Sequence, residues 1–396
     1  MWYTINMLKT YKYRLYPDDN QKDFLSRQFG CCRFVYNWGL GLKTKSWQAY
    51  KKGISIYKIA NKLPELKKEN PWLAEVCSQP LQQSLFHLEK GFTSFFRKKT
   101  KYPRFKSKWD KQAAAFPQHV SVEFSSGTML FPKLGRIRAV FSRTFSGTVK
   151  TVTVTKTPTG KYFASVLVED ESQVQNPVPE TEKRAVGVDL GLKDFLTLST
   201  GEKVQNPKCL DKELKRLACL QQRLSIKKKG SANRNKARLA VALCHEKIVN
   251  RRMDFLHKLS TRLVREFDTL CFEDLHVAGM IQNRHLSRAI GQVGLGIFVR
   301  LCEAKATAFG KHVRKIGRFE PSSKLCSCCG YINSGLKLSE RIWTCPACGQ
   351  THDRDILAAA NIKRMAFAEQ NTLADGEGGP VERPVNKRAR RSRKAS

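Results

Sequence analysis

The chain has 396 residues and carries 72 lysines and arginines against 34 aspartates and glutamates, a formal net charge of +38. Hydrophobic residues make up 41% of the chain, which excludes disorder throughout, and the length predicts two or three domains. So large a positive charge indicates a polyanionic partner. Nucleic acid is the first candidate, because cations that neutralise phosphates release counterions. A membrane partner is not expected, because the sequence has no run of about 18 apolar residues.

The chain has 13 cysteines, an odd number. Several of them stand alone within apolar stretches, which is typical of reduced and buried thiols. Examples are Cys219, Cys244, Cys271 and Cys302. Because disulfides are rare in the cytosol, this usage predicts a cytoplasmic protein.

The first 170 residues show two kinds of pattern. Residues 9–16 alternate apolar and basic side chains, which predicts a strand, and residues 17–100 carry apolar residues at helical spacing. Residues 113–170 predict short strands separated by glycine and proline turns, as in a small β-barrel or sandwich. We expect the N-terminal strand to join this sheet, so that the helices form an insertion.

Residues 97–108 mix cations with aromatic side chains and a proline. Such a segment suits an extended chain that contacts phosphates, but a solvated linker is an equally good interpretation. The candidate nucleic-acid contacts in it are Arg97, Lys98, Lys99, Lys101 and Arg104.

A different order of elements follows a linker at residues 171–183. Short strands are predicted at residues 184–189, 195–198, 269–273 and 312–316. Helices are predicted at residues 211–266 with a break near Gly230, at 287–309 and at 356–365. The basic segment from 368 to 396 has few apolar residues, and we expect it to be disordered and to contact nucleic acid electrostatically.

Three carboxylates stand where this second region would bring them together. Asp189 and Glu273 each end an apolar strand, and Asp355 opens the last helix. Hard divalent cations prefer oxygen ligands, and two such ions can hydrolyse a phosphodiester. The sequence therefore predicts a Mg²⁺ site with two ions at Asp189, Glu273 and Asp355.

Each carboxylate alone has an ordinary structural interpretation. Asp355 is also favourable near a helix N-terminus, and Asp353 is a possible N-cap. The nearest competitors for a metal role are Asp194, Asp274 and Asp353, which we rank second.

A cysteine-rich insert precedes the last helix. Cys326 and Cys329 form one C-x-x-C-G motif, and Cys345 and Cys348 form a second. This spacing predicts a closed, structural Zn²⁺ site, in which the glycine after each pair permits a tight turn. The surplus Cys328 is a possible replacement for a neighbour, and His352 is a less favoured substitute. The nearby Lys324, Lys337, Arg341 and Trp343 suit contact with a nucleic-acid strand.

Together these motifs resemble the TnpB proteins of insertion sequences, relatives of the type V CRISPR effectors. The resemblance covers nearly the whole chain, and its most specific part is the cysteine insert just before the third acid. Its motifs lie at residues 13–17 with Gln21, 30–37, 79–83 with 95–96, 187–191, 273–275, 322–326, both cysteine pairs and 353–362.

The resemblance implies an α+β multidomain fold. It implies a split β-barrel "wedge" with an inserted helical recognition domain, and an RNase H-like RuvC nuclease domain, α/β with a mixed sheet, that carries the four-cysteine zinc finger. The corresponding boundaries are 1–16 with 113–178 for the wedge, 17–112 for the helices, 182–322 with 351–367 for the nuclease, and 323–350 for the finger.

The resemblance also implies an activity. A monomer bound to a guide RNA from the transposon end would cleave double-stranded target DNA beside a short adjacent motif. Base pairing would read the target, and the protein would read the adjacent motif. Gln79, Gln82 and Gln83 are candidates for that reading, because a glutamine amide suits adenine; polar helix surface is at least as good an interpretation of each.

One position departs from the family pattern, since Leu357 stands where the family usually has asparagine, two residues after the third acid. Two alternative functions follow from the same resemblance. One is a nuclease-inactive, RNA-guided DNA-binding repressor of transcription, and the other is a transposase or transposase accessory protein. The presence of all three acids favours the nuclease.

Overall fold

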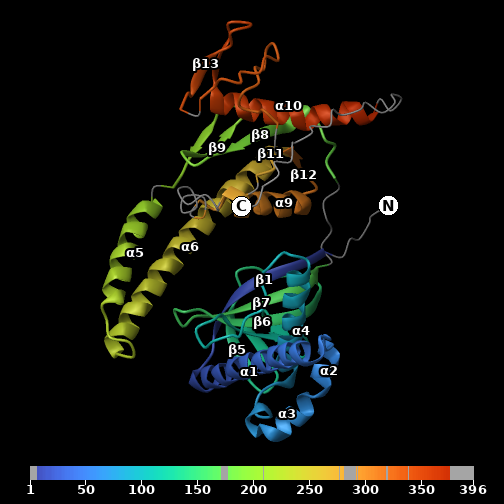
Figure 1. Cartoon of the computed structure of the whole chain (residues 1–396), viewed down its shortest axis with the longest axis vertical. Helices are drawn as coiled ribbons and strands as arrows, with labels where there is room; N and C mark the ends of the chain where they lie inside the picture. The colour runs from blue at the N-terminus through green and yellow to red at the C-terminus, as the bar shows by residue number, and fades with distance from the viewer. Residues whose placement is uncertain are drawn as a thin grey trace, which may run out of the picture. The chain divides into compact units, whose positions relative to one another are not determined.

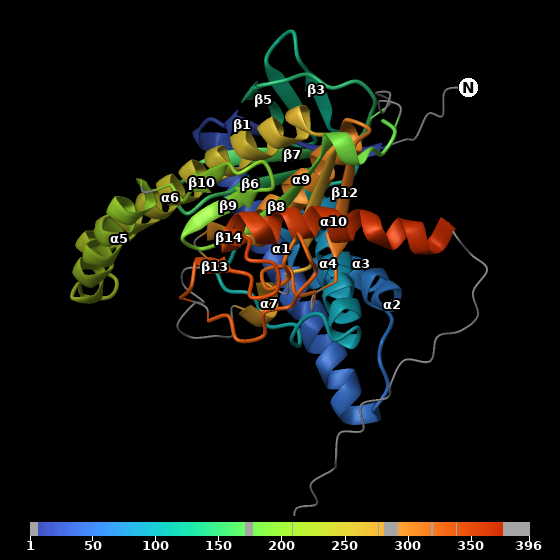
Figure 2. The ribbon, with the colours of Figure 1, turned by 90° about the horizontal axis from the view of Figure 1, so that it is seen from above.

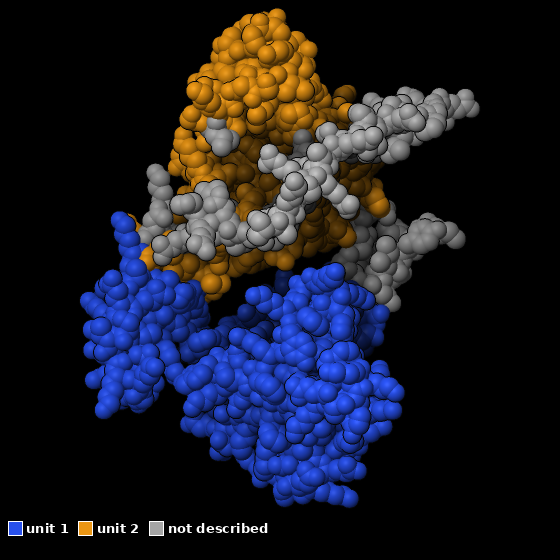
Figure 3. All heavy atoms as spheres, in the orientation of Figure 1, with its two compact units in different colours: residues 1–174, 215–247 blue, residues 175–214, 248–396 orange. Residues whose placement is uncertain are grey.

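The computed structural model describes residues 7–170, 177–207, 209–275, 277–280, 291, 293–317, 320–337 and 339–374. The chain forms two compact units (Figures 1 and 3). Unit 1 contains residues 1–174 and 215–247, and unit 2 contains residues 175–214 and 248–396. Within the described ranges, no helix has both the length and the apolar composition needed to cross a membrane.

Unit 1 is built on a seven-stranded sheet in which every neighbouring pair is antiparallel. The strand order is β2-β6-β7-β1-β5-β4-β3. The strands are β1 (Met7–Tyr16), β2 (Gln112–Phe116), β3 (Ser121–Glu123), β4 (Thr128–Phe131), β5 (Gly135–Val140), β6 (Thr148–Lys156) and β7 (Tyr162–Asp170). The N-terminal strand lies inside the sheet, as expected. The outer strands β2 and β3 are not paired with each other among the described residues, so a closed barrel remains a prediction.

The helices of unit 1 are inserted between β1 and β2. They are α1 (Asp19–Tyr50), α2 (Ile56–Asn61), α3 (Leu63–Glu69), the short 3₁₀ helix η1 (Pro71–Leu73) and α4 (Ser78–Phe96). A capping box starts α1, because the Asp18 carboxylate accepts the Gln21 amide while the Gln21 side chain accepts the Asp18 amide.

Helices and sheet of unit 1 share one hydrophobic core. Tyr13 and Leu15 of β1 belong to the same buried cluster as Leu25 of α1 and Leu81 of α4. An amphipathic helix and a one-sided sheet each need a partner to cover their apolar face, and here they cover each other. The inserted helices and the sheet therefore share one core, and a boundary between a wedge and a helical recognition domain stays a prediction.

Unit 2 is built on a mixed five-stranded sheet in the order β10-β9-β8-β11-β12. β11 runs parallel to both β8 and β12, whereas the β8–β9 and β9–β10 pairs are antiparallel. The strands are β8 (Ala185–Leu190), β9 (Asp194–Leu198), β10 (Lys203–Gln205), β11 (Thr269–Glu273) and β12 (His312–Ile316), preceded by the 3₁₀ helix η2 (Glu182–Arg184).

The remaining helices largely follow the prediction. They are α5 (Cys209–Ser225), α6 (Ala232–Glu266), α7 (Val277–Met280), α9 (Leu295–Ala308) and α10 (Arg354–Ala374). Gly230 separates α5 from α6 with a φ of +86°, a left-handed value that suits glycine. Residues 287–290 and 292 of the helix predicted at 287–309 lie outside the described residues. α10 continues past residue 367, into the segment predicted as tail, and residues 375–396 also lie outside the described residues.

The two faces of the unit 2 sheet have different partners. Val188 and Phe272 point into a core shared with residues of α6 and α9. Gly187 and Cys271, one position earlier on the same strands, face α10, which runs across the sheet in Figure 2. A Cβ at Gly187 would lie 1.8 Å from the carbonyl oxygen of Ala359, so only glycine allows α10 to approach this closely.

Candidate active site and cysteine cluster

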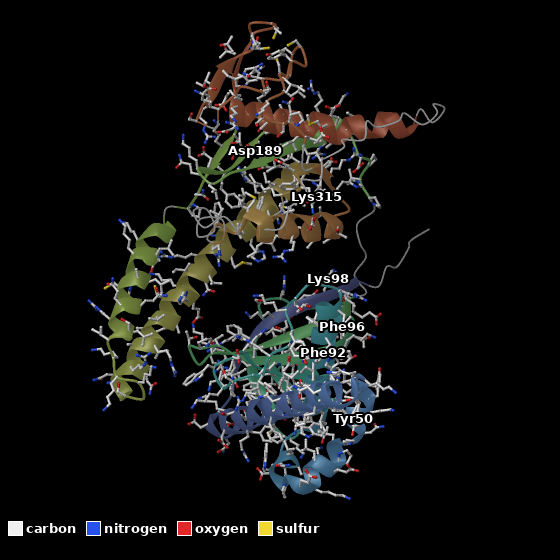
Figure 4. The ribbon with its side chains drawn as sticks, in the orientation of Figure 1. Tyr50, Phe92, Phe96, Lys98, Asp189 and Lys315 are labelled. Carbon is white, nitrogen blue, oxygen red and sulfur yellow. The ribbon has the colours of Figure 1, made fainter. Side chains whose placement is uncertain are left out.

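Two of the predicted acids leave adjacent parallel strands at the same edge. Val188 of β8 pairs directly with Phe272 of β11, and the next residues are Asp189 and Glu273. Side chains alternate between faces, so these two acids belong to the face that Gly187 and Cys271 present to α10. Figure 4 labels Asp189 at this end of β8.

The third acid lies in the first turn of α10. The Asp353 carboxylate caps this helix, because its Oδ1 accepts the backbone N–H groups of Asp355 at 3.0 Å and Ile356 at 3.1 Å. The other Asp353 oxygen pairs with Lys203 at 2.7 Å. The N-cap interpretation of Asp353 is thus confirmed, and Asp355 is the second residue of the helix.

The charges of the three acids influence one another. Burial, followed by the negative charges of Asp355 and Glu273, raises the pKa of Asp189 to about 7. Arg354 and Arg341 act in the opposite direction. Burial and the charge of Asp274 raise the pKa of the Glu273 carboxyl. The fold therefore brings these carboxylates, from residues far apart in the sequence, within electrostatic range of one another.

The acids do not form a tight ligand cage. Among the described residues, the groups whose ligand atoms all lie within 4.8 Å of one another consist of thiols and one histidine, and the three carboxylates are not such a group. Arg341 donates from Nη1 to Oδ1 of Asp355 at 3.0 Å, which occupies one oxygen of the third acid. Arg341 lies before the second cysteine motif, and its sequence position does not indicate this partner.

The secondary candidates lie at the same edge of the sheet. Asp194 begins β9 after the turn that follows β8, and Asp274 follows β11. The Asp274 amide donates to the carbonyl of Ile316 at 3.2 Å, which continues the parallel pairing beyond the strand. Neither observation makes Asp194 or Asp274 a better candidate for a metal ligand than Asp189 or Glu273.

The four predicted cysteine ligands converge. Cys326 and Cys348 have their sulfur atoms 3.7 Å apart, and Cys329 and Cys345 have theirs 3.6 Å apart. Sulfurs on a tetrahedron with Zn–S bonds of about 2.3 Å lie about 3.8 Å apart, whereas a disulfide requires about 2.05 Å. The cluster thus fits a structural zinc ion.

Matching backbone turns hold the two cysteine pairs. Gly330 donates its N–H to the carbonyl of Cys326 at 3.1 Å, and Gly349 donates to that of Cys345 at 2.8 Å. Both glycines have positive φ, +77° and +70°, so the predicted need for glycine is confirmed.

His352 supports the cluster from the side. Its Nε2 lies 3.1 Å from Cys326 Sγ, and Cys326, Cys328 and His352 form a second compact group. Burial opposes ionisation of Cys326, but hydrogen bonds from the backbones of Cys329 and Cys328 and from His352 lower its pKa to about 5. Since the four cysteines already form a closed set, His352 is placed as a hydrogen-bond partner of a thiolate.

Leu357, the departure from the family pattern, points away from the acids. It is 4% exposed and packs in one cluster with Cys326, Leu336, Trp343 and Cys345. Leu357 therefore joins α10 to the cysteine insert. Trp343 lies inside this cluster and is only 6% exposed, so the prediction that it contacts nucleic acid is wrong.

The candidate nucleic-acid contacts of unit 1 lie on α4 and just after it. Gln79, Gln82 and Gln83 share one face of the first turns of α4. The Gln79 amide donates to the Gln118 side chain at 3.1 Å, beyond β2, so the glutamines lie where helices and sheet meet, as expected.

Residues 97–108 are tethered to the helices, which argues against a solvated linker. Asn37 of α1 both donates to the Lys106 carbonyl at 2.9 Å and accepts its amide at 2.7 Å. The Tyr102 ring packs edge-on against Phe92 and Phe95. The predicted cations project from this segment as exposed side chains: Arg97, Lys98, Lys99, Lys101 and Arg104.

Comparison with known sequence families gives three matches along the chain. A helix-turn-helix domain model matches residues 7–52, a model described as a probable transposase matches residues 164–284, and a Cas12f1-like TNB domain model matches residues 296–362. In the structure, residues 7–52 form β1 and the single long helix α1, so the first match is one of sequence and not of a helix-turn-helix arrangement.

Relatives align over the full length of the chain. Two of them carry the name "putative RNA-guided DNA endonuclease". The one from Streptomyces pristinaespiralis is 41% identical, covering 97% of this chain and 95% of its own, and the one from Escherichia coli K12 is 33% identical over 96% of both. A TnpB-like protein of Acanthamoeba polyphaga mimivirus is 26% identical, covering 47% of this chain and 38% of its own.

Among solved structures, a CRISPR-Cas12f ternary complex aligns over 87% of this chain and 81% of its own, with a TM-score of 0.39 and 14% identity. The assignment rests on the sequence relatives, whose identity and two-sided coverage extend over both units. The chain belongs to the TnpB family.

Proposed function

We propose that this protein is an RNA-guided DNA endonuclease encoded by a transposon, and that it hydrolyses double-stranded DNA with Asp189, Glu273 and Asp355. The observation that carries the proposal is geometric: Asp189 and Glu273 follow the paired ends of two adjacent parallel strands, and Asp355 lies in the first turn of α10, which covers the same face of the sheet. In keeping with this, burial and the charges of the other two acids raise the pKa of Asp189. Isolated surface carboxylates do not influence one another in this way.

The donor set fits divalent cations. Three carboxylates that Arg341 neutralises only in part, at Asp355, offer hard oxygen ligands, and two Mg²⁺ ions are the expected cofactors. Bound there, Mg²⁺ would supply the positive charge that activates water and stabilises the leaving oxygen of a phosphodiester. The β8 and β11 strand ends fix two ligands, and the capped start of α10 fixes the third.

The proposed architecture follows the family. Unit 2, with its mixed sheet and α10 on one face, corresponds to an RNase H-like RuvC domain into which the cysteine insert is placed. The first 174 residues of unit 1 would correspond to the wedge and the recognition helices, whereas residues 215–247 of the same unit fall within the proposed nuclease boundaries. A monomer with a guide RNA from the transposon end would read a short motif beside the target with Gln79, Gln82 and Gln83.

The same acids favour cutting over the alternatives. A repressor that only binds has no use for three carboxylates grouped against the end of a capped helix. An absence of cleavage would support one of the two alternative functions, which are DNA binding without cutting and strand joining by a transposase.

Cleavage of a matched target tests the proposal. The full chain is purified with its co-expressed guide RNA and mixed with linear DNA that carries the guide sequence. We expect cleavage in Mg²⁺, none in EDTA, and a loss of at least about 1,000-fold in Asp189→Ala with binding of the DNA largely retained.

Asp254→Asn is the matched control, because Asp254 is an exposed acid of unit 2 that pairs with Lys258 on α6. It should cut like the wild type. Normal cutting by Asp189→Ala would show that the acids are assigned wrongly.

A further inference from the structure

A wide groove lies within unit 1, separate from the carboxylates. Its volume is about 940 Å³, and it is lined by residues of α1, of the segment from 108 to 112, of β6 and the turn after it, and of the first half of α6. A volume of this size is enough for several atoms of a ligand chain and is not a packing defect.

Cations dominate the groove. Five of its lining residues are Arg33, Lys108, Lys111, Lys156 and Arg238. Within the part of the chain that the structure describes, none of these five makes an ion pair, although the chain as a whole forms many. A cluster of unneutralised cations is unfavourable by itself and favours an anionic ligand.

The single carboxylate of the groove is already engaged. Asp110 accepts the amide of Ser107 at 2.6 Å and pairs with Arg104 at 3.1 Å. The Ser107 hydrogen bonds hold the pKa of Asp110 below its usual range, so its charge is committed to fixing this segment. It does not neutralise the cations opposite.

An exposed tryptophan stands among these cations. Trp109 is 65% exposed, with the Arg238 guanidinium 4.2 Å and the Lys108 ammonium 5.0 Å from the ring centroid. The cations orient the indole, yet most of it remains open to solvent. A flat, oriented aromatic surface beside unpaired cations is the arrangement that stacks a nucleobase while binding the adjoining phosphates.

We infer that this groove binds an unpaired segment of RNA, with one base stacked on Trp109 and the phosphates near Arg238 and Lys108; the inference rests on the proposed function. Groups that both donate and accept hydrogen bonds also line the groove, namely Ser26, Thr157 and Asn235. They suit the 2′-hydroxyl, the group by which a protein distinguishes RNA from DNA.

Fluorescence polarisation with two labelled probes tests the inference on the full chain. The probes are a single-stranded oligouridylate and an oligothymidylate of equal length. We expect Trp109→Ala to weaken binding of the RNA on the order of ten-fold and binding of the DNA less, with Trp109→Phe restoring most of the affinity.

Two further readouts separate stacking from a structural role. RNA should quench the tryptophan emission of the wild type more than that of Trp109→Phe, because the stacked indole is the quenched one. Arg238→Ala should reduce the dependence of log affinity on log salt by about 0.7.

Trp47→Ala is the matched control, because Trp47 is 58% exposed on α1 and does not line the groove. It should bind both probes as the wild type does. Equal losses in Trp109→Ala and Trp47→Ala, or no loss in either, would overturn the inference. Equal losses for RNA and DNA would overturn the assignment to RNA.

The outcome is independent of the cleavage test. If the wild type binds its guide RNA and cuts DNA while Trp109→Ala behaves normally, only the groove is assigned wrongly. If the wild type neither retains RNA nor cuts, the proposed function fails.

Discussion

The cysteine cluster and the carboxylate site, both in unit 2, are assembled in opposite ways. The four thiols come from two short turns between residues 326 and 348 and already stand 3.6 and 3.7 Å apart in two pairs. The acids come from two strands and a helix and are not gathered within 4.8 Å. A local motif thus brings its thiols together by itself, whereas the acids depend on the scaffold that β8, β11 and α10 provide.

α10 connects the two sites. Leu357 packs into the cysteine cluster, whereas Asp355, two residues earlier, lies in range of Asp189. Asn361, fully buried, donates to the carbonyls of Ser322 at 2.8 Å and Leu325 at 2.7 Å, just before the first cysteine pair. We therefore expect that a substitution that disrupts the cysteine cluster also displaces Asp355, because both are attached to α10.

Removing a thiol from the four-cysteine cluster should have the largest effect on metal content and on folding of the insert. Cys345→Ser removes a buried thiolate, and we expect it to lose its zinc and to unfold the insert, because structural zinc contributes about 10–16 kcal/mol in zinc-finger peptides. Metal analysis and limited proteolysis between residues 326 and 348 measure this. Cys328→Ser, an exposed thiol outside the four, should keep its zinc. Zinc loss in Cys328→Ser together with retention in Cys345→Ser would support the alternative ligand set with His352.

Weakening the packing of α10 against the cysteine insert should have an intermediate effect on stability. Leu357→Ala leaves a cavity between α10 and the insert, which costs about 2–5 kcal/mol for a buried leucine. Thermal melting should show a clear decrease in Tm, and a chelator should remove zinc faster. Leu243→Ala, at a leucine of α6 that is 48% exposed, should change stability by less than about 0.5 kcal/mol. A Leu357→Ala protein that melts with the wild type would show that the two sites are not joined here.

Removing the repulsion among the acids should have a smaller, pH-dependent effect. The pKa of Asp189 is about 7 in the fold, against an ordinary value of 3.8 for an aspartate. Between these values the unfolded chain loses the proton while the fold retains it, so stability decreases as the pH rises from about 4 to 7. In EDTA, Asp189→Asn should therefore be more stable than the wild type above pH 7, by at most about 4 kcal/mol, and equal to it near pH 4.

Melting curves from pH 4 to pH 8 measure this difference. Mg²⁺ should raise the Tm of the wild type and not that of Asp189→Asn, since only the former keeps the ligand. Parallel pH profiles for the two proteins would mean that neither burial nor the charges of Glu273 and Asp355 raise the pKa of Asp189.

Much of the secondary structure followed from the sequence, because apolar periodicity is a local property. The strand at 312–316 is confirmed at both ends, and the helix pair around Gly230 is confirmed with its break. The shared core of unit 1 did not follow from the sequence: Tyr13 of the sheet and Leu81 of α4 belong to one buried cluster. Periodicity indicates that a face is apolar but not which element covers it.

Sequence alone predicted the four cysteines of the cluster, the glycines after them and the three candidate acids, since short spacings and strand ends carry that information. Only the tertiary structure decided that Leu357 faces the cysteine cluster, that Arg341 binds Asp355, and that Arg238 meets Trp109 over a basic groove. These contacts depend on how helices and strands pack against one another. No local pattern in the sequence indicates them, because the residues that meet are far apart along the chain or have no regular spacing.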